Sequence, residues 1–280
     1  MKTSNHLLRR LTAALLAAVL ALSIALPVFA SDDGDTIYIN SVSDLLSLAK
    51  SCAYDQWSVG KTVILQKDLS LEGMLWEPIP SFSGQFKGNG HTISDLTITG
   101  QYSPAGLFGI VEEQGSIESL SVRGVVSVSD SADTTTGGIV GINHGTLINC
   151  QFTGVVTGDS EVGGIVGRNE SEGTIDHSTA RAIVTGKSST GGIAGYNLGA
   201  ITGCTNVGSI NTEYQEASLD TDGFTAKMVD HINNKMAAAN DDTTNSVTNV
   251  ATDTGGIAGR SSGMILTSVN TGTVGYEHIG

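Results

Sequence analysis

The sequence predicts an all-β solenoid, in which short strands wind into successive coils that stack along one axis. A motif that reads G-G-I-V-G or G-G-I-A-G recurs at Gly137, Gly163, Gly191 and Gly255, with a degenerate copy, A-G-L-F-G, at Ala105. Apolar residues recur at three fixed positions in each repeat of about 26 residues. The 36 glycines and 5% aromatic residues are typical of many short strands joined by tight turns.

Residues 1–30 are predicted to be a secretory signal. A basic start precedes the apolar run Leu11–Leu26, and a V-F-A cleavage site ends at Ala30. The run is short for a membrane span and polar Ser31 follows at once, although a retained anchor is the alternative. Nothing after Ala30 is long and apolar enough to insert in a membrane. We therefore expect a secreted or cell-surface protein, cleaved near Ala30.

The segment 31–104 is expected to form an N-terminal cap and the first coils. Thr36–Asn40 alternates like a short strand, and Lys61–Gln66 follows as a second one. Between them, Ser41 and Asp44 are spaced as the capping box of a helix that reaches Cys52. Such a helix would cover the apolar end of a stack, because solenoids need terminal caps.

The segment 105–280 is expected to contain the repeats, with three short strands per coil and a helical insertion at 211–254. Each strand contributes one apolar position, and equal positions stack into buried rungs, each side chain contributing roughly 1.5–3 kcal/mol. The rungs are Leu107, Ile139, Ile165, Ile193 and Ile257; then Ile117, Leu147, Ile175, Ile201 and Ile265; then Val126, Val156, Val184, Ile210 and Val274.

Glycine and asparagine recur at the predicted turns. Gly137 and Gly138 are expected to adopt positive φ, which costs least for glycine. Asn143, Asn169 and Asn197 align with one another, and asparagine tolerates the left-handed conformation. Their stacked amides are also expected to hydrogen-bond along the axis as an asparagine ladder, rather than to bind a ligand.

Three cysteines in an exported chain leave at least one unpaired. Cys150 and Cys204 occupy the same repeat position, and Ser178 fills it in the repeat between them. Two layers separate the cysteines by roughly 9.6 Å, whereas disulfide Cα atoms lie within about 7 Å. We expect no bridge between them, and interpret both as small buried residues.

The pattern G-G-I-V-G-x-N-x-G-x-(L/I)-x-x-C, which begins at Gly137, resembles the GLUG repeat of bacterial surface proteins. That repeat occurs in adhesin-like proteins and in the non-catalytic region of immunoglobulin A1-specific zinc metallopeptidases. The resemblance covers about 105–280, while 36–104 is similar to the segment that often precedes such repeats. It implies a right-handed parallel β-helix, a hand that periodicity alone does not provide. The last copy departs from the pattern at Ser261 and Ser268.

Insertions fall at one place in the repeat, between the third rung and the next Gly-Gly. They comprise ten residues before Gly137, six before Gly163 and Gly191, and 44 before Gly255. They therefore project from one edge of the solenoid, which in repeat proteins is often the binding face. The longest contains a helical pattern at Phe224–Ala239, which either packs on the flank of the solenoid or forms a partner-binding protrusion.

Acidic residues gather on this variable edge, at Asp130, Asp133, Asp159 and Glu161. Calcium prefers carboxylate and carbonyl oxygens, so these four residues are candidates for a cation site. None of the turns matches a known calcium loop, and the alternative is a solvated acidic edge. No other metal and no organic cofactor is indicated.

No catalytic motif is present. No histidine is followed by glutamate as in H-E-x-x-H, and the chain lacks G-x-S-x-G. His91 lies in a Gly-rich turn with no Asp or Glu at a spacing that would orient its imidazole, and is interpreted as a turn residue. In the repeats, basic residues such as Arg168 and Lys187 do not pair by spacing with an acidic cluster. The formal net charge of −14 argues against nucleic acid and anionic membranes as partners.

These features predict a non-enzymatic scaffold or adhesion module whose partner is an extracellular protein or glycan. The alternatives are the non-catalytic arm of a larger secreted enzyme, such as a peptidase, and a carbohydrate-active β-helix enzyme. The last coil ends near Val274 with no cap of its own. We therefore expect further repeats or a partner at this end, because an open coil exposes free backbone groups.

Overall fold

The computed structural model describes residues 35–54, 56–128, 134–212 and 252–275. The chain divides into two compact units, Met1–Ala30 and Ser31–Gly280, and all described residues belong to the second. The predicted signal and its cleavage site therefore lie outside the described residues, as does the predicted helix at Phe224–Ala239.

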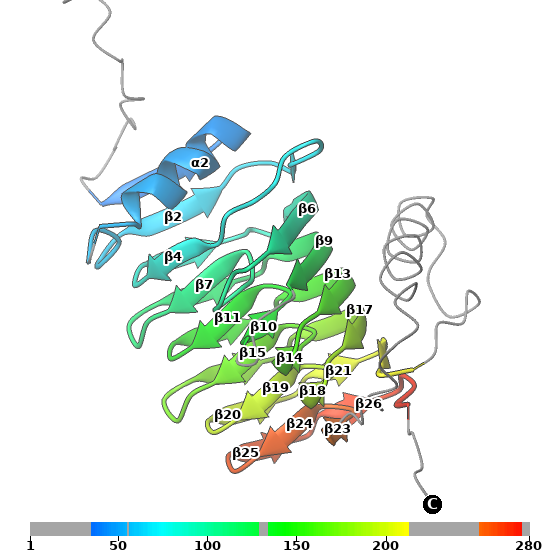
Figure 1. Ribbon diagram of the computed structural model, residues 1–280. Helices are drawn as coiled ribbons and strands as arrows, with labels where there is room; N and C mark the ends of the chain where they lie inside the picture. The colour runs from blue at the N-terminus through cyan, green and yellow to red at the C-terminus, as the bar shows by residue number, and fades with distance from the viewer. Residues whose placement is uncertain (1–34, 55, 129–133, 213–251, 276–280) are drawn as a thin grey trace, which may run out of the picture. The chain divides into compact units, whose positions relative to one another are not determined.

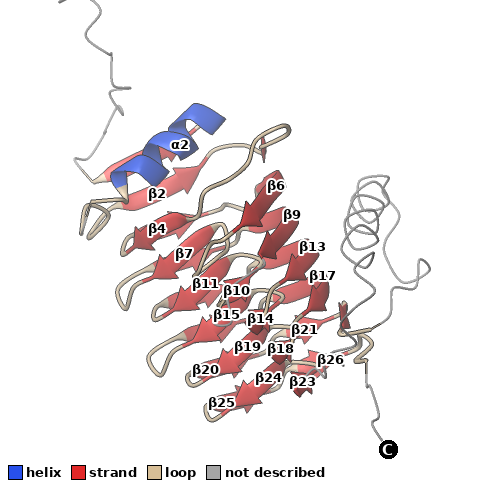
Figure 2. Ribbon diagram, in the orientation of Figure 1, coloured by secondary structure: helices blue, strands red, loops and turns tan. Residues whose placement is uncertain are grey.

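The described residues form a parallel β-solenoid with one short helix, as predicted (Figures 1 and 2). The first sheet has eight strands that pair in the order β1 (Thr36–Ile39), β2 (Thr62–Leu65), β5 (Gln85–Lys87), β8 (Ser116–Glu118), β12 (Thr146–Ile148), β16 (Thr174–Asp176), β20 (Ala200–Thr202) and β25 (Met264–Leu266). Every pairing between the described strands of this sheet is parallel, so each coil adds one strand to the edge left by the previous coil.

Two further long sheets complete the walls of the coils. One pairs in the order β4 (Ile79–Phe82), β7 (Phe108–Val111), β11 (Val140–Asn143), β15 (Val166–Asn169), β19 (Ala194–Asn197) and β24 (Ala258–Ser261). The other pairs in the order β3 (Leu69–Ser70), β6 (Thr92–Gly100), β9 (Ser121–Val128), β13 (Gln151–Thr157), β17 (Thr179–Thr185), β21 (Thr205–Asn206) and β26 (Val269–Asn270), and β22 (Ser209–Ile210) also pairs with β17. Both sheets contain strands from before and after residue 104, so the predicted boundary between 31–104 and 105–280 does not interrupt the solenoid.

The coils carry a fourth short strand where the sequence predicted three. It forms the sheet β10 (Thr136–Gly137), β14 (Ser160–Gly163), β18 (Ser188–Gly191) and β23 (Thr252–Gly255). The first predicted rung lies at the bend after this strand, so that Ile139 sits between β10 and β11. A residue at a corner can face the core just as a strand residue can. The number of buried positions per repeat therefore does not give the number of strands per coil.

All three predicted rungs are buried columns. In the coils from Leu107 to Ile210 each rung residue has no exposed surface. The registers agree, because Leu147 pairs with Ile175 and Ile175 pairs with Ile201. Only the last coil differs, where Ile265 is 39% exposed.

The N-terminal helix is present as α2 (Val42–Ser51), and it lies across the start of the coil stack (Figure 1). Ser41 is its N-cap and accepts a hydrogen bond from the backbone N–H of Asp44 at 3.2 Å. The Asp44 carboxylate reaches back to the N–H of Asn40 at 2.9 Å, one residue before the cap. Leu45 and Leu48 are fully buried, so the helix covers the apolar end as predicted.

The asparagine ladder is confirmed. Nδ2 of Asn143 donates to Oδ1 of Asn169 at 2.8 Å, and Asn169 donates to Asn197 at 2.8 Å. Asn197 donates in turn to Oγ of Ser261 at 3.1 Å. The three amides are fully buried, and each also bonds to backbone groups of its own turn. A second ladder, from Asn206 to Asn270 at 2.7 Å, was not predicted.

The conformational argument for these positions was wrong. None of the ladder asparagines has positive φ. One column of left-handed residues stands directly before the cysteine column, at Ser119, Asn149, His177, Gly203 and Thr267, and a second stands in the fourth strand, at Glu161, Ser189 and Asp253. The paired glycines also lack positive φ. They are required by close approach, since a Cβ on Gly138 would lie 2.4 Å from the Phe152 ring and one on Gly164 would lie 2.2 Å from the Gly192 carbonyl oxygen.

The three cysteines are free and buried, which is the expected state of Cys150 and Cys204. The column that contains Cys150 and Cys204 also accepts hydrogen bonds along the axis. The N–H of Cys150 donates to Oγ of Ser178 at 3.1 Å, and the N–H of Ser178 donates to Sγ of Cys204 at 3.4 Å. The N–H of Cys204 donates to Oγ of Ser268 at 3.1 Å. Cysteine and serine alternate here because both present a small acceptor to the coil before.

Candidate functional site

The outer face of the β4–β24 sheet carries a column of side chains that changes character along the stack. Ser81, Ile110 and Ile142 occupy it in the earlier coils. Arg168, Tyr196 and Arg260 continue it in the later coils. The guanidinium carbons of Arg168 and Arg260 lie 5.1 and 5.4 Å from the centroid of the Tyr196 ring. Tyr196 is thus held between two cations by cation–π contacts.

Arg168 is the centre of the largest described ion-pair group. Its Nη1 lies 2.7 Å from Oε1 of Glu161, and its Nε lies 2.6 Å from Oε1 of Glu170. Partial burial acts to lower the pKa of this guanidinium, but the hydrogen bonds and charges of Glu170 and Glu161 outweigh it and raise the pKa. Arg168 therefore stays charged and links Glu161 to Glu170 across its own coil. The sequence spacing predicted that Arg168 would not pair with acidic residues, and that prediction is wrong.

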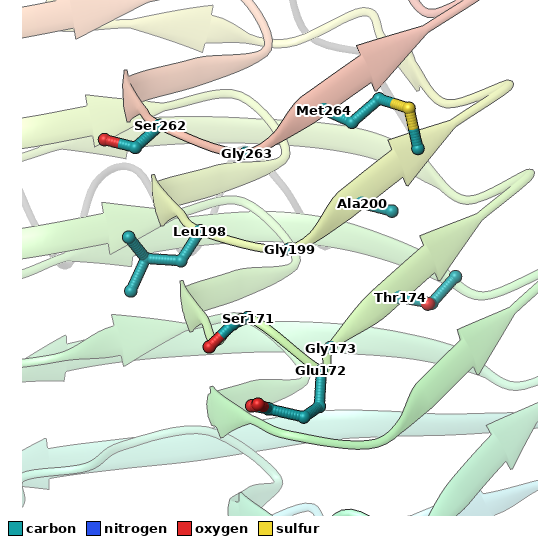
Figure 3. A pocket seen from close by; sticks show the side chains of 10 residues that line it. All are labelled: Ser171, Glu172, Gly173, Thr174, Leu198, Gly199, Ala200, Ser262, Gly263 and Met264. Atoms are coloured by element: carbon teal, nitrogen blue, oxygen red, sulfur yellow. The ribbon is translucent and has the colours of Figure 1, made fainter.

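A shallow groove follows the turns next to this column (Figure 3). Its volume is about 470 Å³, and it crosses the turns between β15 and β16, β19 and β20, and β24 and β25. Gly173, Gly199 and Gly263 form its floor, and Leu198 and Met264 contribute apolar side chains. An extended ligand that lies parallel to the solenoid axis would cross three successive coils, each of which contributes one glycine to the floor.

Two of the four candidate cation ligands are engaged with basic side chains. Asp159 Oδ1 lies 2.5 Å from Nζ of Lys187. Glu161 binds Arg168 through one oxygen and accepts a hydrogen bond from Thr135 through the other, at 3.0 Å. Asp130 and Asp133 lie outside the described residues. In the described ranges no group of three His, Cys, Asp or Glu side chains is placed to hold a metal.

His91 has a carboxylate partner that its sequence spacing did not reveal. Its Nδ1 lies 3.1 Å from Oδ1 of Asp68, an exposed residue of the previous coil. The same oxygen accepts the N–H of Thr92 at 2.9 Å. The Thr92 hydrogen bond and then the His91 contact lower the pKa of Asp68. No nucleophilic side chain completes the pair among the described contacts, so it anchors a turn.

The cysteine thiols are poorly suited to nucleophilic chemistry. Burial raises the pKa of Cys52 and Cys150 to about 12 and that of Cys204 to about 11. Since the thiolate is the nucleophile, these groups are unreactive near neutral pH.

Comparison with known families identifies one of the coils. Residues 158–185 match the GLUG motif. The matched GLUG motif runs from β14 through β15 and β16 to the end of β17, which is one complete turn of the solenoid. The strands of this coil pair in register with those of the neighbouring coils, so one GLUG motif corresponds to one coil of the solenoid.

Two curated proteins are similar in sequence. Halomucin of Haloquadratum walsbyi is 32% identical in an alignment of 155 residues, and the match covers 51% of this chain and 2% of Halomucin. A protein of Evansella cellulosilytica, provisionally named a Gly-rich membrane protein, is 29% identical in an alignment of 137 residues, and the match covers 35% of this chain and 16% of that protein. The chain thus matches only a small part of either relative.

One solved structure is similar in fold, a protein of Bacteroides ovatus provisionally named an immunoglobulin A1 protease. It is 20% identical, with a TM-score of 0.49, and the match covers 64% of this chain and 60% of that one. As for membranes, the described part of the chain holds no helix with the length and apolar character of a transmembrane span.

Proposed function

We propose that this protein is an exported, non-enzymatic scaffold whose outer surface binds an extracellular protein or glycan. The observation that carries the proposal is how the polar side chains are used. The buried amides and hydroxyls bond between coils, the Lys187–Asp159 ion pair joins two neighbouring coils, and Arg168 pairs with two glutamates of its own coil. Amides, hydroxyls and charged groups that are already hydrogen-bonded or ion-paired within the solenoid are not available for catalysis. Surface binding is therefore the function that the described residues support best.

The groove at the turns is the proposed contact surface. It places a glycine at the same point of three successive coils, and its last two turns have the same length, which suits a partner with its own repeating unit, such as a glycan chain or an extended peptide. Export is supported by the predicted signal in 1–30. The Evansella relative, named as a membrane protein, supports a location at the cell envelope.

The proposal is tested with the whole chain on an array of glycans and extracellular-matrix proteins. We expect saturable binding that weakens when Leu198→Asp and Ala200→Asp place charges in the groove. Thr153→Asp is the matched control, because Thr153 faces outward from β13 on another sheet. If both kinds of variant bind alike, the groove is not the contact surface.

A turnover assay separates this proposal from an enzymatic function. Acidic polysaccharides, peptides and immunoglobulin A1 are incubated with the whole chain at high protein concentration. We expect no product. Release of new reducing ends or peptide fragments, lost in the groove variants, would overturn the non-enzymatic reading.

The second candidate function is that of a non-catalytic arm within a larger secreted protein. It is favoured by the small share of each relative that the chain matches, 2% and 16%, because repeat modules of this kind then occur inside much longer proteins. The complete reading frame distinguishes the two: a catalytic region in the same frame would support the arm.

A further inference from the structure

The corner that follows β5 is two residues longer than the corresponding corner of the next coil. Lys87 at the end of β5 pairs with Glu118, and Thr92 pairs with Ser121. Residues 88–91 therefore lie between the two paired positions, where the next coil has only two residues. The three coils after that also have two, because their strands keep the register of Glu118 and Ser121.

The extra residues form a tight turn. The N–H of His91 donates to the carbonyl oxygen of Gly88 at 2.8 Å, which closes a β-turn. The two central residues, Asn89 and Gly90, have φ of 51° and 78°, as in a type I′ turn. Asn-Gly is the favoured pair for that turn, because both residues tolerate the left-handed region. The local sequence thus specifies the turn.

The turn is held from both neighbouring coils. Nδ2 of Asn89 donates to the carbonyl oxygen of Leu65 in the coil before, at 3.3 Å. The N–H of Gly90 donates to the carbonyl oxygen of Ser119 in the coil after, at 2.8 Å. The carboxylate contact of His91 adds a further link to the coil before. Because the turn is fixed on both sides, a ligand that binds beside it does not have to order it first.

A hollow of about 360 Å³ lies beside this turn. It is lined by four polar side chains and one glycine: Lys87, Asn89, Gly90, Glu118 and Ser119. Its volume is at the small end of the roughly 300–1,000 Å³ of ligand pockets in proteins, and it admits a small molecule. The hollow lies where the strands of the first sheet end, whereas the groove of Figure 3 lies where they begin, so the two are separate.

Two opposite charges line the hollow without pairing to each other. Lys87 and Glu118 are cross-strand neighbours, and neighbours of opposite charge stabilise a sheet when they pair. In the part of the chain that the structure describes, neither side chain makes an ion pair or a hydrogen bond. An ammonium and a carboxylate therefore border one small space, and both are available to a ligand.

These charges select the kind of ligand. A ligand with a single charge would be attracted by one group and repelled by the other, so the two Coulomb energies would largely cancel. A ligand that carries both charges gains from both groups. Ser119 adds a hydroxyl, which can donate to a carboxylate or accept from an ammonium. The net charge of −14 also repels free anions but not a neutral zwitterion.

We propose that the hollow at the Asn89–Gly90 turn binds a small zwitterion whose ammonium and carboxylate lie close together, as in an α-amino acid. Glu118 binds the ammonium group, Lys87 binds the carboxylate, and Ser119 hydrogen-bonds to the bound molecule. The site is independent of the groove, and it gives the solenoid a small-molecule site in addition to the proposed contact surface.

The test is a titration of the nitrogen-15-labelled whole chain with free glycine, followed by amide chemical shifts. We expect saturable shift changes at the amides that border the hollow, those of Gly88, Gly90 and Ser119. Acetate and methylammonium each carry one of the two charges and should bind about tenfold more weakly than free glycine, or weaker still. Triglycine, whose charges are farther apart, should also bind more weakly. All titrations are run at one ionic strength, because salt screens exposed charges.

Lys87→Gln and Glu118→Gln should each weaken the binding of free glycine about tenfold, since each leaves one charge of the ligand without a partner. Glu118 is exposed and Lys87 is half-buried, so both variants should fold. Exchange of the two charges, in Lys87→Glu with Glu118→Lys, should restore binding, because the ligand can reverse in the hollow. Lys50→Gln is the matched control at an exposed lysine of α2, and it should leave the dissociation constant unchanged.

The proposal is overturned if free glycine leaves these three amides unshifted, which would mean that Lys87 and Glu118 close on each other in solution. It is also overturned if acetate or methylammonium binds as tightly as free glycine, or if Lys50→Gln weakens binding as much as Lys87→Gln does. A charge-exchanged variant that keeps its other amide shifts but does not bind would count against it in the same way.

Discussion

At the scale of single residues, the stack is held by side chains that bond to the same position one coil away. Asn169 both accepts from Asn143 and donates to Asn197, at 2.8 Å each. The ladder therefore has a direction, with each amide N–H donating toward the C-terminal end. Ser261 ends it, because its hydroxyl accepts from Asn197 and donates to the carbonyl of Gly263 at 3.3 Å.

Replacing Asn169 by leucine, which has a similar volume, is expected to lower the free energy of unfolding by about 2–6 kcal/mol. The Asn143 amide and the Asn197 carbonyl oxygen would stay buried but would each lose the hydrogen bond to Asn169, at about 1–3 kcal/mol per group. Chemical denaturation measures the loss. Gln101→Leu, at an exposed residue, is the control and should change little. Equal stability of the two variants would show that the ladder contributes nothing net.

The Asp68–His91 pair predicts a pH dependence at low pH. The pKa of Asp68 is lowered from its ordinary value of 3.8, so the folded state favours the ionised carboxylate. Its contribution to stability is complete above that value and is lost as the pH falls through the lowered pKa. Denaturation midpoints measured between pH 5 and pH 2 should therefore fall less steeply in Asp68→Asn than in the parent. Parallel curves would contradict the assignment.

At the scale of strands and turns, inward and outward positions alternate in each short strand, and glycine marks the places where two coils come closest. In β20, Ile201 is fully buried while Thr202 faces outward. At the bend before β15, Gly164 lies so near the next coil that only a hydrogen fits beside the Gly192 carbonyl. These two features, alternation and close approach, are the elementary design of one coil.

Ile201→Ala is expected to lower the free energy of unfolding by about 2–5 kcal/mol, because it removes a fully buried side chain from a stack that cannot collapse around the cavity. Thr202→Ala in the same strand should cost less than about 0.5 kcal/mol. Urea denaturation of both variants provides the measurement. A reversal of the order would refute the inward register of this rung.

Gly164→Ala is expected to destabilise the fold by about 1–3 kcal/mol, as overpacking does, since the new methyl group would lie 2.2 Å from a backbone oxygen that cannot turn away. Gly109→Ala is the matched control, because its nearest neighbours are 3.2 Å away. Thermal unfolding of the two variants should differ clearly; indistinguishable melting would show that the coils can separate at this corner without cost.

At the scale of the whole molecule, the solenoid has two unlike ends and one variable edge. The helix α2 covers the N-terminal end, while among the described residues β25, at the other end, pairs with β20 alone. Along the variable edge, Lys187 neutralises Asp159 and Arg168 neutralises Glu161. The two described candidate carboxylates are thus held in ion pairs, one between neighbouring coils and one within a coil, rather than open to a cation.

Calcium is therefore expected to leave the melting temperature of the whole chain unchanged. A cation that bound the folded state alone would raise it by mass action. Here the cation would have to displace Lys187 and Arg168 from their carboxylates first. Differential scanning calorimetry in millimolar calcium and in chelator decides the matter, and a clear upward shift in calcium, abolished by Asp159→Asn, would reinstate the cation site.

The sequence by itself determined the repeat, the three buried rungs, the asparagine ladder and the helix cap at Ser41. These follow from local spacing, because stacked coils place the same repeat position at the same point of every coil. Only the tertiary structure decided the fourth strand, the reason for the paired glycines and the partners of Arg168 and His91. Those depend on distances across corners, within one coil for Arg168 and between neighbouring coils for His91 and the glycines, where turn geometry, rather than position in the repeat, sets which atoms meet.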